Sequence, residues 1–379
     1  MLVYLTYAEQ PSGVYSSQVS DVVQHLNQRF SAGVRLVAFV SLRGFRATRV
    51  KIRKEVPGAI VLPALPKAEY WRVSAFMFWV LCLVFRPKAV MARNVLAANM
   101  GLFARRLGAV RTVCFDGRGA VAAEWHEYDV SVPPSWKASI SELERKAVVD
   151  SNFRIAVTHK LVEHWRERYG YSDHHHVVIP CTLNRSFRPH VLTDEEKSAG
   201  KRFLGLQDEH VVLVYSGSAA GWQSFSVLHA CVAPFLNASR DHKLLVLAPD
   251  DEHIRSLERE FPNQVMRKWV AHHEVPALLA ACDMGILVRE KSITNRVASP
   301  TKFAEYLSAG LPVLISEELG DYSDFVMTHA CGRVASENSP LQVSPTTHAL
   351  RKAMVELVVA HFTKEAMEKE YTQLLHHLS

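Results

Sequence analysis

A lysine and a glutamate one helical turn apart form the pair in this sequence that is best suited to hold a phosphorylated ligand. Pro300 can open a helix that carries Lys302 in its first turn and Glu305 three positions later, on the same face. Ser299 can cap this helix, and Gly310 ends it. A lysine neutralises a diphosphate, while a carboxylate accepts both hydroxyls of a ribose. The pattern therefore predicts that Ser299, Lys302 and Glu305 bind a nucleotide-bearing substrate, called the donor below. The alternative is a surface Lys–Glu pair.

A second polar cluster follows the apolar run 110–115. Asp116, Arg118, Glu124 and His126 lie within 11 residues of sequence. A protein core does not tolerate such groups unpaired, so they are expected at a site. Asp116, Arg118 and Glu124 are therefore candidate functional residues of the first domain. The alternative is an Asp–Arg pair that only holds the loop.

Two loops of small residues follow predicted strands and can offer backbone N–H groups to an anion or a sugar hydroxyl. One contains Gly13, and the other contains Ser216, Gly217 and Ser218. We predict these four residues as donor-binding, with an ordinary helix-capping turn as the alternative for Gly13. Neither loop has the spacing of a P-loop or of a G-x-G-x-x-G dinucleotide motif.

Arg289 and Glu290 follow another apolar run and are also predicted to bind the donor. The remaining polar runs favour structural interpretations. The acids at 250–251 fit a loop turn, and the histidines at 174–176 and 272–273 fit solvated loops, because neighbours on a strand point to opposite faces.

These segments belong to a regular alternation of apolar runs and helical patterns, which is typical of parallel sheets covered on both faces. Strands are expected at 1–6, 34–41, 59–62, 88–91 and 110–115, and again at 211–215, 243–247, 264–266, 284–288 and 312–315. The fold class predicted is α/β, with two Rossmann-like doubly wound domains facing a cleft.

The boundary between the domains is expected in the proline-bracketed segment 179–189. The first domain would span 1–188 and the second 189–360. A long amphipathic helix is expected at 348–378, and the last residues, about 360–379, could return to the first domain. Ligands of open α/β sheets bind at the carboxyl ends of the strands, so the function should reside in the loops that face the cleft.

The two halves differ in charge. Residues 1–188 contain 26 Lys and Arg against 14 Asp and Glu, and the remainder contains 18 against 24. A basic half favours an anionic partner: a phosphate-bearing substrate, anionic lipid or nucleic acid. The apolar stretch 73–85 is too short to cross a bilayer, which takes about 20 residues. It predicts a buried core helix or a helix lying in a membrane interface, with the basic run 43–54 supporting the second alternative.

Composition bounds the class of protein. With 379 residues, 48% hydrophobic and 22% charged, the chain is globular and long enough for two domains. Six scattered cysteines without a C-x-x-C pair argue against a zinc ribbon and a disulfide framework, and favour a reducing compartment. The first residues form a strand-like run rather than a signal peptide, so we expect a cytoplasmic protein.

Three motifs resemble those of glycosyltransferases of the GT-B fold, family four, of the bacterial envelope glycan type. They are S-P-T-K-F-A-E-Y-L-S-A-G-L-P-V-L-I at 299–315, V-I-P-C-T-L-N-R-S-F-R-P at 178–189, and F-D-G-R-G at 115–119 followed by Glu124. The resemblance implies a nucleotide-sugar donor whose ribose is bound by Glu305, transfer with retention of anomeric configuration, and no metal cofactor. It also implies that Asp116, Arg118 and Glu124 are the catalytic residues of the first domain and face the acceptor or the transferred sugar.

The sequence departs from the family at three places. Val297 stands where many members have a second glutamate, and Asp116 stands where many have a histidine. The loop after 211–215 has Trp222 and Gln223 where many members have arginine and lysine, so Lys302 and Arg289 would bind more of the diphosphate.

The function predicted is sugar transfer to a glycan or lipid-linked acceptor, with the protein peripheral on the inner face of the cytoplasmic membrane. One alternative is a nucleotide-sugar 2-epimerase, which would act on the donor without an acceptor. Another is a non-catalytic glycan-binding protein, which would bind the donor without turnover. Nucleic acid is not expected as a partner, because the aromatic residues lie in an apolar block and are not interleaved with the basic run.

Overall fold

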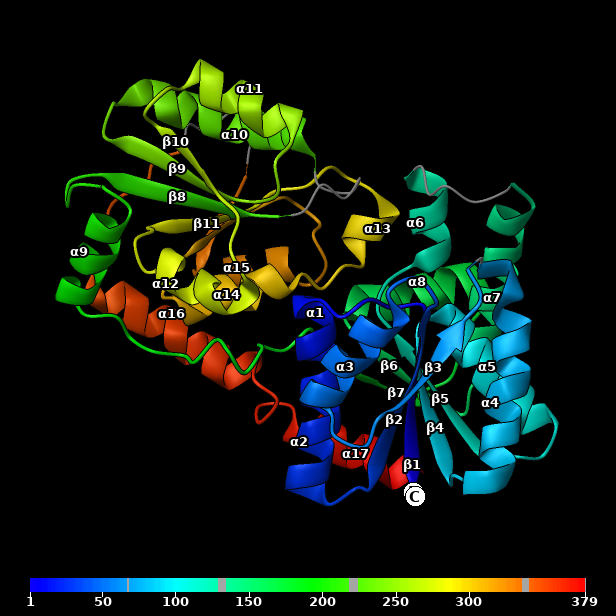
Figure 1. Cartoon of the computed structure of the whole chain (residues 1–379). Coiled ribbons are helices and arrows are strands. Elements are labelled where there is room, and N and C mark those ends of the chain that lie inside the picture. Colours follow the sequence, from blue (N-terminus) through cyan, green and yellow to red (C-terminus); the bar gives the residue numbers. More distant parts are fainter. Residues whose placement is uncertain (67, 129–133, 218–223, 336–340, 379) are drawn as a thin grey trace. The chain divides into compact units, whose positions relative to one another are not determined.

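The computed structural model describes the chain except residues 67, 129–133, 218–223, 336–340 and 379 (Figure 1). The described residues divide into two compact units. Unit 1 comprises Met1–Asn184, Val297–Ser299 and Lys364–Ser379, and unit 2 comprises Arg185–Arg296 and Pro300–Thr363. The chain therefore leaves unit 1 at residue 185, and its last residues belong to unit 1 again.

Unit 1 is built on a seven-stranded parallel sheet. Its strands are β1 (Leu2–Tyr7), β2 (Val34–Ser41), β3 (Ile60–Ala64), β4 (Ala89–Arg93), β5 (Thr112–Gly117), β6 (Phe153–Ala156) and β7 (His176–Val178), in the order β3-β2-β1-β4-β5-β6-β7. The strand order reverses between β1 and β4, which is the point where doubly wound sheets bind ligands.

Helices cover both faces of this sheet, which explains why its strands are apolar along most of their length. Cores on opposite faces involve α2 (Asp21–Phe30), α3 (Phe45–Glu55) and α17 (Glu368–Leu378) on one side, and α4 (Trp71–Phe85), α5 (Val95–Arg106), α7 (Pro134–Asp150) and α8 (His159–Tyr169) on the other. Shorter segments are α1 (Gly13–Tyr15), a π-helical turn at Ser16–Ser20, a 3-10 turn at Ala68–Tyr70, and α6 (Val121–Glu127).

Unit 2 has a six-stranded parallel sheet. Its strands are β8 (Val211–Ser216), β9 (His242–Leu247), β10 (Val265–Lys268), β11 (Met284–Leu287), β12 (Val313–Ile315) and β13 (Gly332–Val334), in the order β10-β9-β8-β11-β12-β13. Its helices are α9 (Asp194–Phe203), α10 (Phe225–Ala238), α11 (Glu252–Glu260), α12 (Val275–Leu279), α13 (Ile293–Arg296), α14 (Thr301–Ser308), α15 (Tyr322–His329) and α16 (His348–His361), with a 3-10 turn at His272–Glu274.

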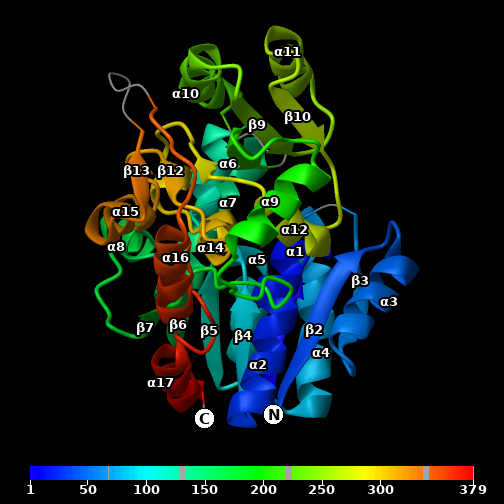
Figure 2. The same cartoon turned by 90° about the vertical axis from the view of Figure 1, so that its left-hand side faces the viewer.

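The predicted α/β class with two doubly wound sheets is confirmed, and all ten predicted strands are present. The sequence analysis did not predict β6, β7 or β13, which are short strands of three or four residues. The single long helix predicted for 348–378 is wrong. It divides into α16 and α17 around Lys364, whose buried ammonium donates to the Leu183 carbonyl of unit 1 at 3.0 Å. This break lets α17 pack on the first sheet (Figure 2).

Helix α4 is a core helix on one of its faces, which confirms in part the first of the two alternatives that its sequence left open. One face is buried in the core of unit 1, where Trp71, Ser74, Ala75, Phe78 and Cys82 lie. The other face is apolar and exposed. Among the residues that the structure describes, no helix is long and apolar enough to cross a membrane.

Candidate functional site

Helix α14 holds Lys302 and Glu305 together at the start of its first two turns. Glu305 is 3% exposed, and its Oε2 lies 2.8 Å from Lys302 Nζ. Burial alone would raise the pKa of Glu305, but the charge of Lys302 and a hydrogen bond from His272 outweigh it and lower this pKa to about 2. The pair is therefore not a solvated surface pair: it presents a buried, fully ionised carboxylate.

His272 contributes to the same cluster, which contradicts the sequence prediction of a solvated loop histidine. Its Nε2 lies 3.4 Å from Glu305 Oε1, and its ring lies against Phe187 with centroids 5.1 Å apart. The loop after β10 brings it there, at the carboxyl edge of the sheet. The rule that ligands bind at the carboxyl ends of strands also applies to this loop. The sequence gives no sign, however, that His272 reaches Glu305, which lies 33 residues later.

Tyr306 fixes α14 against the ends of two strands. Its buried hydroxyl accepts a hydrogen bond from Ser216 N at 2.9 Å and donates to the Ile286 carbonyl at 3.3 Å. The ring lies so close to Gly285 that a Cβ added there would be 2.3 Å from it. The glycine in β11 thus allows the helix to approach the sheet closely. The Tyr306 hydroxyl then holds the helix turn that carries Glu305 at the end of β8.

Arg289 and Glu290 differ in their surroundings. Arg289 is half-buried, and its Nη1 donates to Asn295 Oδ1 at 3.2 Å, while its backbone exchanges hydrogen bonds with Ser316 Oγ at 2.7 Å. Asn295 in turn donates to the Glu290 carbonyl at 3.0 Å, and the Glu290 side chain is exposed. The loop is thus ordered around Arg289, which stays a predicted phosphate ligand.

Ser299 does not cap α14, contrary to the sequence prediction. Pro300 occupies the cap position, and Ser299 Oγ accepts a hydrogen bond from Cys181 N at 2.8 Å in unit 1. Gly217 N bonds the Leu247 carbonyl at 3.1 Å, which anchors the start of the small-residue loop. Ser218, Trp222 and Gln223 lie outside the described residues.

In unit 1, Asp116 is fully buried at the end of β5 and forms the centre of a polar network. Arg118 places Nε 2.7 Å from its Oδ1 and Nη2 3.0 Å from its Oδ2. Tyr4, on β1, donates its hydroxyl to the same carboxylate. Burial would lower the pKa of Arg118, but Asp116 holds it well above its ordinary value. The Asp–Arg pair that the sequence analysis gave as an alternative is therefore present. Arg118 remains partly exposed.

Arg93 and Glu9 extend this network and were not predicted. Arg93 pairs with Asp116 in the register of β4 and β5, and its Nη1 lies 3.9 Å from Asp116 Oδ2. Its Nε donates to Glu9 Oε2 at 2.8 Å, and Asn94 donates to Glu9 Oε1 at 3.2 Å. Asp116 therefore lies among two guanidinium groups and a phenol at the point where the strand order reverses.

Glu124 lies on α6 with its side chain partly buried, and burial raises its pKa above the ordinary value. Within the described part of the chain, its carboxyl group forms no ion pair or hydrogen bond. The start of α6 is held by Glu144, which accepts from Val121 N at 3.1 Å, Ala122 N at 2.8 Å and Tyr169 Oη at 3.0 Å. A carboxyl group with a raised pKa and no partner is suited to proton transfer.

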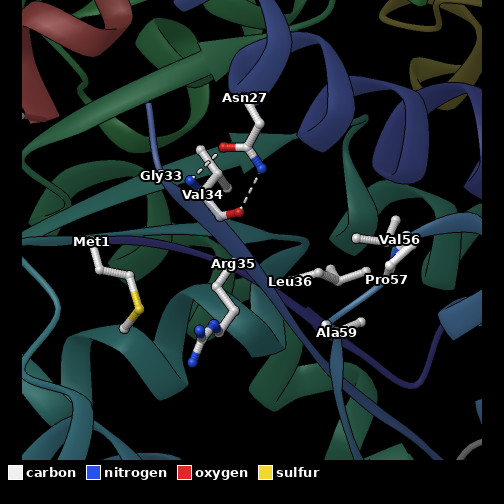
Figure 3. Close-up of a pocket in the computed structure, with 10 residues that line it drawn as sticks. Met1, Asn27, Gly33, Val34, Arg35, Leu36, Val56, Pro57 and Ala59 are labelled. Carbon is white, nitrogen blue, oxygen red and sulfur yellow. Dashed lines mark hydrogen bonds between the residues drawn. The ribbon is translucent and has the colours of Figure 1, made fainter. Parts of the chain in front are cut away.

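Three other features, two helix caps and one hollow, offer less to a reaction. Gly13 begins the three-residue α1, which Ser12 caps by accepting from Tyr15 N at 3.2 Å, so the capping turn is present there. Asp251 caps α11, as the loop-turn interpretation predicted. A hollow of about 300 Å³ lies at the amino-terminal ends of β1 and β2, opposite the end that carries Asp116 (Figure 3). The Asn27 side chain there donates to the Val34 carbonyl at 2.8 Å and accepts from Val34 N at 2.7 Å.

The chain matches no protein-family model and no curated protein. Solved structures do resemble it over its whole length. Sucrose-phosphate synthase from Thermosynechococcus elongatus is 14% identical with a TM-score of 0.71, over 100% of this chain and 99% of that one. Anabaena HepE in complex with UDP is 11% identical with a TM-score of 0.70, over 99% of both chains. The lipopolysaccharide outer core galactosyltransferase WaaB is 12% identical with a TM-score of 0.67, over 99% of both chains.

A putative UDP-N-acetylglucosamine 2-epimerase from Listeria monocytogenes is less similar. It is 11% identical with a TM-score of 0.54, over 98% of this chain and 90% of that one. At these identities the comparisons establish the fold and leave the activity open. The fold of this chain is therefore the two-sheet fold shared by GT-B glycosyltransferases.

Proposed function

We propose that this protein transfers a glycosyl group from a nucleotide-sugar donor to a hydroxyl of a glycan or lipid-linked acceptor. The observation that carries the proposal is the buried, ionised Glu305 beside Lys302. A carboxylate of this kind accepts hydrogen bonds from both ribose hydroxyls, and hydrogen bonds to charged groups contribute about 1.5–3 kcal/mol each. Resemblance at 299–315 and the names of the structural neighbours support the same assignment.

Unit 2 binds the donor in this proposal. Lys302 and Arg289 neutralise the diphosphate. The backbone N–H groups of Ser216 and Gly217 are already bonded to the Tyr306 hydroxyl and the Leu247 carbonyl, so the contact that Ser216 adds comes from its own hydroxyl. As the glycosidic bond breaks, negative charge accumulates on the leaving diphosphate, and fixed cations stabilise it. Because cations and helix termini can supply this charge, we propose that the reaction needs no divalent metal.

Unit 1 binds the acceptor in this proposal. Glu124 is the group suited to accept or return the acceptor proton, because burial raises its pKa and it has no partner among the described residues. Asp116 and Arg118 position the acceptor or the transferred sugar. We propose retention of anomeric configuration on the strength of the family resemblance, and proton NMR of the first product formed distinguishes it from inversion.

A screen of nucleotide sugars tests the donor assignment. Wild-type protein is expected to be stabilised against thermal unfolding by one class among UDP, GDP, CMP, dTDP and ADP sugars. Glu305→Gln should weaken this stabilisation, with affinity reduced about tenfold to a hundredfold. Glu163→Gln is the matched control, because Lys160 and Glu163 have the same spacing on α8 but are exposed, 3.3 Å apart. An equal effect of the two substitutions, or no stabilisation by any donor, contradicts the proposal.

The epimerase alternative is favoured by the likeness to the Listeria monocytogenes structure. It is separated by incubating the stabilising donor with and without an acceptor. Transfer needs the acceptor and yields a glycoside, whereas an epimerase converts or hydrolyses the donor alone.

A further inference from the structure

Helix α4 presents a continuous apolar stripe to the outside of unit 1. Val73, Phe76, Val80 and Leu83 recur at three- and four-residue spacing and are 42–55% exposed, and Val84 beside them is 71% exposed. The opposite side of the helix is buried in the core. A helix that covers a sheet normally turns polar residues outward, so this outward face is unusual.

The stripe concentrates apolar surface in one place. Among the described residues, 18 large hydrophobic side chains are exposed, and seven of them lie between residues 70 and 85. Single exposed hydrophobic residues are normal on a protein surface, whereas a contiguous group marks a site that binds a protein or a membrane.

From residue 70 onward, the charged residues along the sequence of the stripe are all basic, and Glu69 precedes them. Residues 70–115 contain seven Lys and Arg and no Asp or Glu. Arg72 and Arg86 bracket the stripe and are exposed, and Lys88 follows. Within the described part of the chain, none of these three forms an ion pair. Arg35, on β2, lies with its guanidinium 5.5 Å from the centre of the Phe85 ring. Helix α5, which packs along α4, ends in Arg105 and Arg106.

We propose that α4 lies flat on an anionic lipid bilayer, with Val73, Phe76, Val80 and Leu83 at the boundary of head groups and acyl chains. The helix has 15 residues and is about 22 Å long, which is too short to cross the bilayer but suited to lie within its surface. The bracketing arginines meet anionic head groups, where each basic residue strengthens binding roughly fivefold. This inference rests on the proposed function in one respect only, that the acceptor is lipid-linked.

The basic helix α3 is not part of this surface. Its buried Ile52 packs in the core on the opposite face of the sheet from α4 (Figure 1). Residues 43–54 and 73–85, which the sequence suggested as one docking region, therefore cover different faces. The proposal assigns lipid contact to α4, while α3 adds to the net charge of the unit.

Vesicle flotation of the full chain tests this assignment without donor or turnover, so it can fail independently of the sugar-transfer proposal. The probes are vesicles of phosphatidylcholine alone and of phosphatidylcholine with about a third phosphatidylglycerol. Wild-type protein should float with the anionic vesicles, and salt should weaken the binding. The triple variant Phe76→Gln, Val80→Gln, Leu83→Gln should lose at least tenfold in vesicle affinity, because its apolar stripe is removed.

The matched control exchanges three apolar side chains of unit 2 that are even more exposed: Phe203→Gln, Met327→Gln and Val359→Gln. Vesicle binding by this control should equal that of the wild type. Unchanged folding of both triple variants is checked by far-UV circular dichroism. The proposal is overturned if the wild type floats with neither vesicle, or if the two triple variants bind anionic vesicles equally. It is also overturned if light scattering shows a dimer that the α4 variant abolishes, since a second copy would then cover the stripe.

Discussion

At the scale of single residues, the position of Glu305 depends on how closely Tyr306 approaches the sheet. The Tyr306 hydroxyl accepts a hydrogen bond from Ser216 N at 2.9 Å. Glu305 precedes Tyr306 on the same turn of α14, so this bond also fixes the position of Glu305. The absence of a side chain at Gly285 makes this approach possible.

Gly285→Ala is expected to displace the Tyr306 ring, because the new Cβ would lie 2.3 Å from it. The free energy of unfolding should fall by about 1–3 kcal/mol, as in other overpacked cores. Nucleotide affinity should fall as well, because the displaced ring carries Glu305 with it. Urea denaturation and nucleotide titration measure the two effects.

Gly119→Ala is the control for this experiment, since a Cβ at Gly119 meets nothing within 4 Å. Its free energy of unfolding should stay within about 0.5 kcal/mol of the wild type. A Gly285→Ala protein as stable as this control would show that the contact between α14 and β11 is not tight.

At the scale of elements, the buried Glu144 carboxyl group controls how α6 begins. Burial raises its pKa to about 7, although hydrogen bonds from Ala122 N, Tyr169 and Val121 N oppose the rise. In the native state this group therefore keeps a proton that the unfolded chain has released above its ordinary pKa of 4.5.

The free energy of unfolding should consequently decrease by about 3 kcal/mol as the pH rises from about 4.5 to about 7, since the native state binds more protons in that window. Glu144→Gln should remove this slope. Urea denaturation between pH 4.5 and 8 measures it. Glu142→Gln on the same helix is the control, because ion pairing with Arg145 lowers the pKa of Glu142 to about 2, outside the window. Parallel slopes for wild type and Glu144→Gln would contradict the assignment.

The elements were largely predictable from sequence, and their side-chain partners were not. Apolar runs bounded by turn residues located ten strands, and the loop rule selected Glu305 and Asp116. Arg93 was not predicted, because its position beside Asp116 depends on the register of β4 with β5. His272 reaches Glu305 through a loop that follows a different strand. Ser299 was misassigned as a cap because its hydroxyl accepts from Cys181 N, 118 residues away.

At the scale of the whole molecule, each unit has a core of its own, and the chain's last helix belongs to the first. Tyr371, Leu374 and Leu378 of α17 are buried beside β1 and α2 in unit 1. Stability of unit 1 should therefore depend on residues that follow unit 2 in the sequence.

Leu374→Ala should destabilise unit 1 by about 2–5 kcal/mol, because a fully buried leucine is removed. Hydrogen exchange should accelerate in β1, β2 and α2, while the amides of β8 to β12 keep their protection. The neighbouring exposed Gln373→Ala serves as the control and should leave both units unchanged. Faster exchange confined to unit 2 would refute this dependence.

The central claim is that Glu305 binds the ribose of the donor, and calorimetry with a deleted ligand group tests it most directly. The nucleoside diphosphate that stabilises the protein is compared with its 2′,3′-dideoxy form, on wild type and on Glu305→Gln. The account predicts that wild type prefers the ribose form by about tenfold or more, and that Glu305→Gln binds both forms equally. Equal affinities on the wild type, or a preference that survives in Glu305→Gln, would contradict it.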